Sequence, residues 1–159
     1  MELRNFHCIG SILSLSYASV PCFLLAPSPI LVRQWHRAYE DGKIINPSIS
    51  ALSALSYAFL SYRIYGTLNH PKAEMYALSA LFTLAIVPYT VLAMQSTNKK
   101  LQKKVEEMKG LDISEKATEI GLAKGESAKE LLDWWATLNF GRGLFPLVGS
   151  ILGLWATLQ

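Results

Sequence analysis

Three residues in the last apolar stretch of the chain have the spacing of a reactive site. Trp135, Asn139 and Arg142 follow one another at i, i+4 and i+7, so a helix carries them on one face. A guanidinium deep in an apolar helix is costly unless it is paired, and such a residue usually marks a functional site. Asn139 and Arg142 together can present a fork of N–H donors to an anionic oxygen.

Further polar and aromatic residues flank two other apolar stretches on the same side. His36 is the candidate general base, because imidazole changes its charge near neutral pH. Asn98 supplies an amide three residues after Gln95. Trp35 and Tyr39, at i and i+4, form an aromatic ledge of the kind found at membrane interfaces.

Other chemistries find little support in the residues. Cys8 and Cys22 are fourteen apart on one apolar stretch and cannot pair on a single helix. Two cysteines and three scattered histidines give no metal-ligand spacing, and no phosphate-binding loop or nucleophile motif is present. A net charge of +3 is too small and too dispersed to predict nucleic-acid binding.

The composition indicates that these residues are carried by membrane-spanning helices. The 159 residues are 51% hydrophobic and 17% charged, against about 25% charged residues in soluble domains. The charges are concentrated between Lys99 and Asp133, which leaves long apolar runs elsewhere. We expect a single all-α domain (1–159), a four-helix transmembrane bundle with a polar, partly helical insert. The expected spans are 6–27, 47–65, 75–95 and 134–158, and the expected insert is 96–133.

Helix signals and charges refine this topology. Asn46 and Pro47 supply an N-cap and a first-turn proline, which predicts that the second span begins there after a loop at 32–46. Lysine and arginine gather in 32–46 and 96–133, so both segments are expected to be cytoplasmic loops of a multi-pass endomembrane protein. Gly149 and Gly153 offer a small-residue surface through which copies of the chain can pack as a homo-oligomer.

Several segments, taken in order and spacing, resemble the DUF1772 family, which includes the fungal anthrone oxygenases. The resemblance covers nearly the whole chain except about 101–130. It is carried by Val20-Pro21, Gln34-Trp35 with Tyr39 and Gly42, Pro88-Tyr89-Thr90 with Thr97-Asn98, and Trp135, Leu138-Asn139, Arg142-Gly143, Pro146-Leu147 and Gly149.

The resemblance implies a small membrane oxygenase that oxidises an anthrone-type aromatic polyketide with dioxygen, with no cofactor. Such a reaction needs a base, a stabiliser for the enolate oxygen and a dry aromatic pocket. The implied catalytic residues are Arg142, Asn139, Asn98 and His36. The implied substrate-binding residues are Trp35, Tyr39, Gln34, Tyr89, Gln95 and Trp135.

Two other functions fit the same residues. One is a membrane enzyme of the same fold that cyclises or isomerises a lipophilic natural product. The other is a non-catalytic module that binds a lipophilic molecule. The expected partners are a lipophilic aromatic small-molecule substrate and the lipid bilayer.

Overall fold

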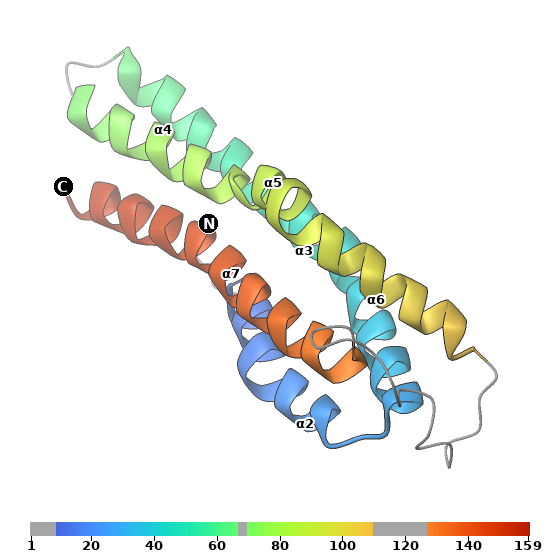
Figure 1. Cartoon of the computed structure of the whole chain (residues 1–159). Helices are drawn as coiled ribbons and strands as arrows, with labels where there is room; N and C mark the ends of the chain where they lie inside the picture. The colour runs from blue at the N-terminus through green and yellow to red at the C-terminus, as the bar shows by residue number, and fades with distance from the viewer. Residues whose placement is uncertain (1–8, 67–69, 110–126) are drawn as a thin grey trace.

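The computed structural model describes residues 9–66, 70–109 and 127–159, and every regular element in these ranges is a helix (Figure 1). The N-terminal helix, Ile9–Leu24, contains the π-helical turn η1 (Leu15–Ser19) and α2 (Val20–Leu24). The helix α3 covers Ser28–Tyr65. A second long helix, His70–Glu107, is built from α4 (His70–Leu84), α5 (Ile86–Tyr89), the π-helical turn η2 (Thr90–Met94) and α6 (Gln95–Glu107). The last helix, α7, covers Ala128–Leu158.

Three of these helices are long and apolar enough to cross a membrane: Ser28–Tyr65, His70–Glu107 and Ala128–Leu158. Of the first of the four expected spans, the described part is the apolar helix Ile9–Leu24, and this part alone is shorter than the roughly 20 residues that a crossing requires. Residues 6–8 of that span lie outside the described residues.

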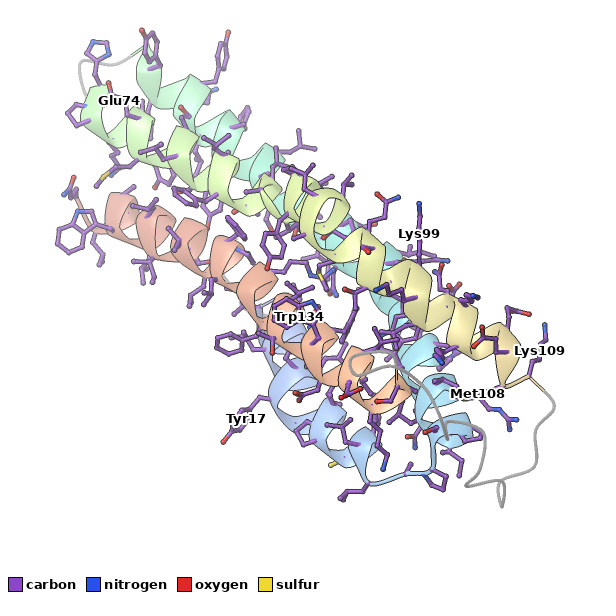
Figure 2. All side chains as sticks on the ribbon, viewed as in Figure 1. Tyr17, Glu74, Lys99, Met108, Lys109 and Trp134 are labelled. Atoms are coloured by element: carbon purple, nitrogen blue, oxygen red, sulfur yellow. The ribbon has the colours of Figure 1, made fainter. Side chains whose placement is uncertain are left out.

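The bundle has an apolar half and a more highly charged half. Two of the long helices contain 38 residues each, about 57 Å at 1.5 Å per residue, which exceeds the ~30 Å hydrocarbon core of a bilayer. Figure 2 shows Lys99 and Lys109 at the α6 end and Glu74 near the opposite end. Large exposed apolar side chains line the apolar half, which is the half away from the α6 end. Among them are Leu52, Leu55, Phe59, Leu78, Leu81, Val87, Val91, Val148, Ile151, Leu154 and Leu158.

Each half has its own core. In the apolar half, α3, α4 and α7 pack around Tyr57, Tyr76 and Ala156. In the other half, the N-terminal helix joins the first part of α3, α6 and the first part of α7 around Trp35, Leu101 and Trp135 (Figure 1). The bundle thus has three helices in its apolar half and four in its other half, and the candidate polar residues lie where the two halves meet.

The expected loop at 32–46 is wrong, because this segment forms the first part of α3. The helix begins at Ser28, after Pro27 in an extended conformation and with Pro29 in the first turn. Charged residues along this part pair at helical spacing: Arg37 with Asp41 at 3.3 Å and Lys43 with Glu40 at 2.6 Å. These contacts and the buried apolar face continue the helix through Pro47, which therefore lies inside it rather than at its start.

The other boundaries of the expected insert also shift. The third span continues into α6, in which Leu101 is buried, and Met108 is buried directly after the end of α6. The fourth helix begins at Ala128, six residues before the expected start at 134. Ser127 caps it, since the Ser127 hydroxyl oxygen accepts a hydrogen bond from the Glu130 N–H at 3.2 Å.

Prolines accompany the irregular turns of two helices. A proline has no N–H to donate to the carbonyl four residues earlier, which weakens the regular hydrogen bonding of the helix at that point. Pro88 removes the donor for Leu84, the last residue of α4. Pro21 follows η1, where the Val20 N–H donates to the carbonyl of Leu15, five residues back. The two π-helical turns η1 and η2 both lie beside the site described below.

Two glycines of α7 allow close helix packing in the apolar half. A Cβ added at Gly149 would lie 2.6 Å from Oγ1 of Thr83 and 2.9 Å from the carbonyl oxygen of Ser79. A Cβ added at Gly153 would lie 2.5 Å from Cε1 of Tyr57. The small surface that these glycines form is thus occupied by α3 and α4 of the same chain.

We expect Gly149→Ala to lower the stability of the protein by about 1–3 kcal/mol, because the added methyl group overlaps a backbone carbonyl that cannot move freely. Thermal unfolding of the purified protein in detergent measures the effect. Gly10→Ala is the control, since nothing lies within 4 Å of a Cβ there. Equal unfolding temperatures for Gly149→Ala and Gly10→Ala would contradict the close packing.

Candidate active site

A cavity of about 170 Å³ lies between α3 and the α5–η2 segment, with α7 and the N-terminal helix behind it. Its walls are mostly apolar, and its polar groups come from a few residues on three helices. Val87 and Val91 line it and are also about half exposed, so the cavity opens sideways through the apolar surface. The lining residues that carry polar or aromatic groups are Tyr39, Lys43, Asn46, Thr90, Asn98, Trp135 and Arg142.

Arg142 lines the cavity and is held by Asn139, as the shared helix face predicts. Nη2 of Arg142 donates to Oδ1 of Asn139 at 2.5 Å. Asn139 itself is fully buried and lies behind the cavity wall rather than in it. Its Nδ2 donates to the carbonyl of Ile12 at 3.0 Å and to Oγ of Ser16 at 2.7 Å. Both amide donors of Asn139 are therefore engaged with the N-terminal helix.

Asn98 and Trp135 form a second polar contact in the cavity wall. Nε1 of Trp135 donates to Oδ1 of Asn98 at 2.8 Å, and both side chains are buried. Because Oδ1 serves as the acceptor for the indole, the Nδ2 group of Asn98 is the one that can donate to a molecule in the cavity. The structure thus brings Arg142, Asn98, Trp135 and Tyr39 together at one cavity.

Trp35 supports the aromatic side of the cavity from behind. Its ring stacks on Tyr39 with centroids 5.0 Å apart, and it meets Trp135 edge to face at 6.0 Å. Trp35 is completely buried and does not line the cavity. It fixes the orientation of the two aromatic residues that do.

The remaining candidates lie outside the cavity wall. Gln34 and Gln95 are exposed. Tyr89 packs against Phe145 with centroids 5.2 Å apart. His36 is half buried on α3, three residues before Tyr39 and therefore on nearly the same helix face. Nδ1 of His36 is buried and has no hydrogen-bond partner among the described residues.

Three polar lining residues, Lys43, Asn46 and Thr90, were not among the candidates from sequence. Lys43 and Asn46 were assigned to a loop, and only their place on α3 turns them toward the cavity. Thr90 lies in η2, where its hydroxyl donates to the carbonyl of Ile86 at 2.6 Å. Pro88, two residues earlier, was the one available sign that this turn is irregular.

The charged residues at the cavity are both cations, Arg142 and Lys43, and none of its described lining residues is acidic. Lys43 pairs with Glu40, and its Nζ lies 5.9 Å from the centroid of the Tyr39 ring. The hydrogen bond from Lys43, aided by the charges of Lys43 and His36, holds the pKa of the Glu40 carboxyl below its usual value. Within the described ranges, no three His, Cys, Asp or Glu side chains gather as a metal site.

A family model described as "Anthrone oxygenase" matches residues 35–152, which is most of the chain. The chain belongs to the anthrone oxygenase family. The protein "Anthrone oxygenase encC" of Aspergillus fumigatus is 35% identical over 158 residues, covering 94% of this chain and 85% of that protein. "Anthrone oxygenase nsrD" of Aspergillus novofumigatus is 34% identical over 152 residues, covering 94% and 86%. "Monooxygenase hypC" of Dothistroma septosporum is 32% identical over 151 residues, covering 93% and 75%.

No solved structure matches the chain. The resemblance to the anthrone oxygenases that the sequence motifs predict is thus confirmed by the family model and by these relatives. The range that matches the anthrone oxygenase model contains every lining residue of the cavity except Leu15. The N-terminal helix, which contacts Asn139, precedes that range.

We expect Lys43→Gln to raise the pKa of the Glu40 carboxyl toward its usual value, since the hydrogen bond and the nearby charge are lost. Because the pKa is lowered in the folded protein, the pair stabilises the fold above the ordinary carboxyl range. That contribution disappears as the pH falls through the lowered pKa. Carbon-13 NMR titration of the Glu40 carboxyl measures this pKa, with Lys103→Gln as the control. An unchanged titration in Lys43→Gln would show that the pair does not form.

Proposed function

We propose that this anthrone oxygenase family member oxidises an anthrone-type aromatic polyketide with dioxygen in the cavity between α3 and α5–η2. One observation carries the proposal most directly: Arg142 and Asn98, two polar donors from different helices, line an otherwise mostly apolar cavity that also contains Tyr39 and Trp135. This combination fits a flat aromatic molecule with one oxygen that becomes negative during the reaction.

The first step is the formation of the enolate. The substrate methylene lies between two aryl rings and opposite the ring carbonyl, so loss of its proton places negative charge on that carbonyl oxygen. In the proposed complex, Arg142 and the Nδ2 group of Asn98 donate to this oxygen. Donors that are already oriented in a poorly hydrated site stabilise a developing anion more than water does, because they need no reorganisation.

We assign the proton to His36, which lies on the same face of α3 as Tyr39 but one turn outside the cavity. The proton would reach it through the Tyr39 hydroxyl or a water molecule. The enolate carbon then forms a C–O bond with dioxygen, and the resulting peroxide anion takes the proton back from His36 to give a hydroperoxide. Loss of the second C–H proton and cleavage of the O–O bond release water and leave the quinone. The sum is one anthrone and one O₂ giving one anthraquinone and one H₂O.

The sideways opening suits a substrate that is dissolved in the membrane. Val87 and Val91 border it within the apolar exposed surface, while the lysines of α6 lie toward the other end. We propose that the bilayer surrounds the apolar half and that the end bearing Lys99 and Lys109 faces the cytoplasm, as expected where lysine and arginine are concentrated.

Oxygen uptake in membranes that contain the protein tests the proposed reaction with an anthrone as substrate. We expect uptake above that of membranes without the protein, and a decrease of about 100-fold or more in Arg142→Ala, because an oxyanion donor is lost. Arg37→Ala is the control, since Arg37 is an exposed cation of α3 that does not line the cavity.

The same assay separates the alternatives. Uptake equal to that of empty membranes would refute the oxygenase proposal. Conversion of the substrate without oxygen uptake would favour a cyclase or isomerase, and binding without conversion would favour a lipophile-binding module.

The role of His36 has a separate test in the pH dependence of turnover. A base is inactive when protonated, so we expect the rate of the wild-type protein to fall on the acidic side and to rise with pH. In His36→Gln we expect a lower rate without that acidic limb. His70→Gln, at the far end of the molecule, is the control. A variant that keeps the wild-type pH profile would remove His36 from the mechanism.

A further inference from the structure

Asn139 is the contact between the N-terminal helix and Arg142, although it does not line the cavity itself. Its amide makes three hydrogen bonds, one to Arg142 and two to the N-terminal helix. We infer that Ser16 is a positioning residue that fixes the direction of the Arg142 guanidinium through this amide. The inference deepens the proposed function and rests on it for its kinetic consequence.

The orientation of the Asn139 amide determines whether its oxygen or its NH₂ group faces the Arg142 guanidinium. An asparagine amide has an accepting oxygen on one side and two donors on the other. If the amide turned over, its NH₂ group would face the guanidinium, and two groups that can only donate would oppose each other. Acceptors on the N-terminal helix exclude this orientation, because they hold Nδ2 on their own side. Oδ1 then faces Nη2 of Arg142.

In its described part, Ile9–Leu24, the N-terminal helix supplies two acceptors to Asn139, which are Oγ of Ser16 and the carbonyl of Ile12. Ser16 lies in the π-helical turn η1, and its own hydroxyl donates to the same carbonyl of Ile12 at 3.1 Å. Ser16 therefore gives one hydrogen bond to Ile12 and receives one from Asn139. A residue at this position without a hydroxyl leaves one donor of Asn139 unpaired in a buried site.

The two helices are close enough for this contact because of Gly143. A Cβ added there would lie 2.8 Å from Cδ2 of Leu13 and 3.1 Å from Cγ2 of Ile12. The contact between α7 and the N-terminal helix therefore has little freedom to rearrange when one hydrogen bond is removed. The expected response to loss of Ser16 is motion of the Asn139 amide and of the guanidinium that it holds.

The experiment compares the wild-type protein with Ser16→Ala in detergent micelles, with Ser14→Ala as the matched control on the exposed side of the same helix. The first measurement is nitrogen-15 NMR of the arginine side chains, in which the Arg142 signals are assigned by their loss in Arg142→Lys. A guanidinium held at Nη2 gives separate signals for its two terminal nitrogens. We expect these to be separate in the wild type and Ser14→Ala and to merge in Ser16→Ala.

The second measurement is steady-state turnover of an anthrone by the same preparations. We expect kcat per folded molecule to fall about tenfold in Ser16→Ala, while KM stays within twofold, because a displaced donor weakens the transition state more than the bound substrate. The folded fraction is measured in parallel by thermal unfolding, which separates a positioning role from a structural one.

Separate, unchanged Arg142 signals in Ser16→Ala would overturn the inference, as would a loss of activity that only follows the folded fraction. The NMR measurement does not depend on the substrate. If the wild type consumes no oxygen with any anthrone while the Arg142 signals still merge in Ser16→Ala, the proposed function fails and the positioning role of Ser16 stands.

Discussion

The arrangement of the site depends on the need to pair a guanidinium that is partly buried in an apolar helix bundle. A charged group in low-dielectric surroundings is strongly destabilising unless other polar groups accept its N–H donors. Asn139 accepts a hydrogen bond from Nη2 of Arg142, and because Asn139 is buried, its own two N–H donors need acceptors in turn. The carbonyl of Ile12 and the hydroxyl of Ser16 receive them. One buried charge thus fixes α7 and the N-terminal helix relative to each other.

The helices beside these hydrogen bonds are irregular. The π-helical turn η1, which contains Ser16, is followed by Pro21, and η2 follows Pro88 beside the cavity. Such turns are frequent at functional sites in proteins. Here they lie on two different helices that both border the residues of the site.

Much of the apolar architecture could be predicted from the sequence. The long apolar runs mark the parts of three helices that are apolar enough to cross a membrane, and the i, i+4, i+7 spacing correctly places Asn139 and Arg142 on one face. The start of α3 could not be predicted in this way, because the sequence alone does not show whether a proline begins a helix or lies inside one. Pro47 indicates the first alternative, and the ion pairs of the preceding turns support the second.

The partners of Asn139 were beyond sequence reasoning for a different reason. A π-helical turn takes one additional residue, so the face on which Ser16 lies does not follow from a regular 3.6-residue period. The inclusion of Lys43 in the cavity wall depends likewise on the unexpected first part of α3. The role of His36 stays a prediction, since the structure places it near the cavity and outside its wall.

In the proposed arrangement, in which the bilayer surrounds the apolar half, the sideways opening at Val87 and Val91 determines which concentration of a ligand the site experiences. An apolar molecule that enters from the bilayer is then present at the opening at its concentration in lipid, which is set by its partition coefficient. At a fixed total amount of ligand, adding lipid therefore dilutes the ligand at the site, although the volume of water is unchanged. In that arrangement, affinities of this protein become comparable between preparations only when they are expressed per mole of lipid.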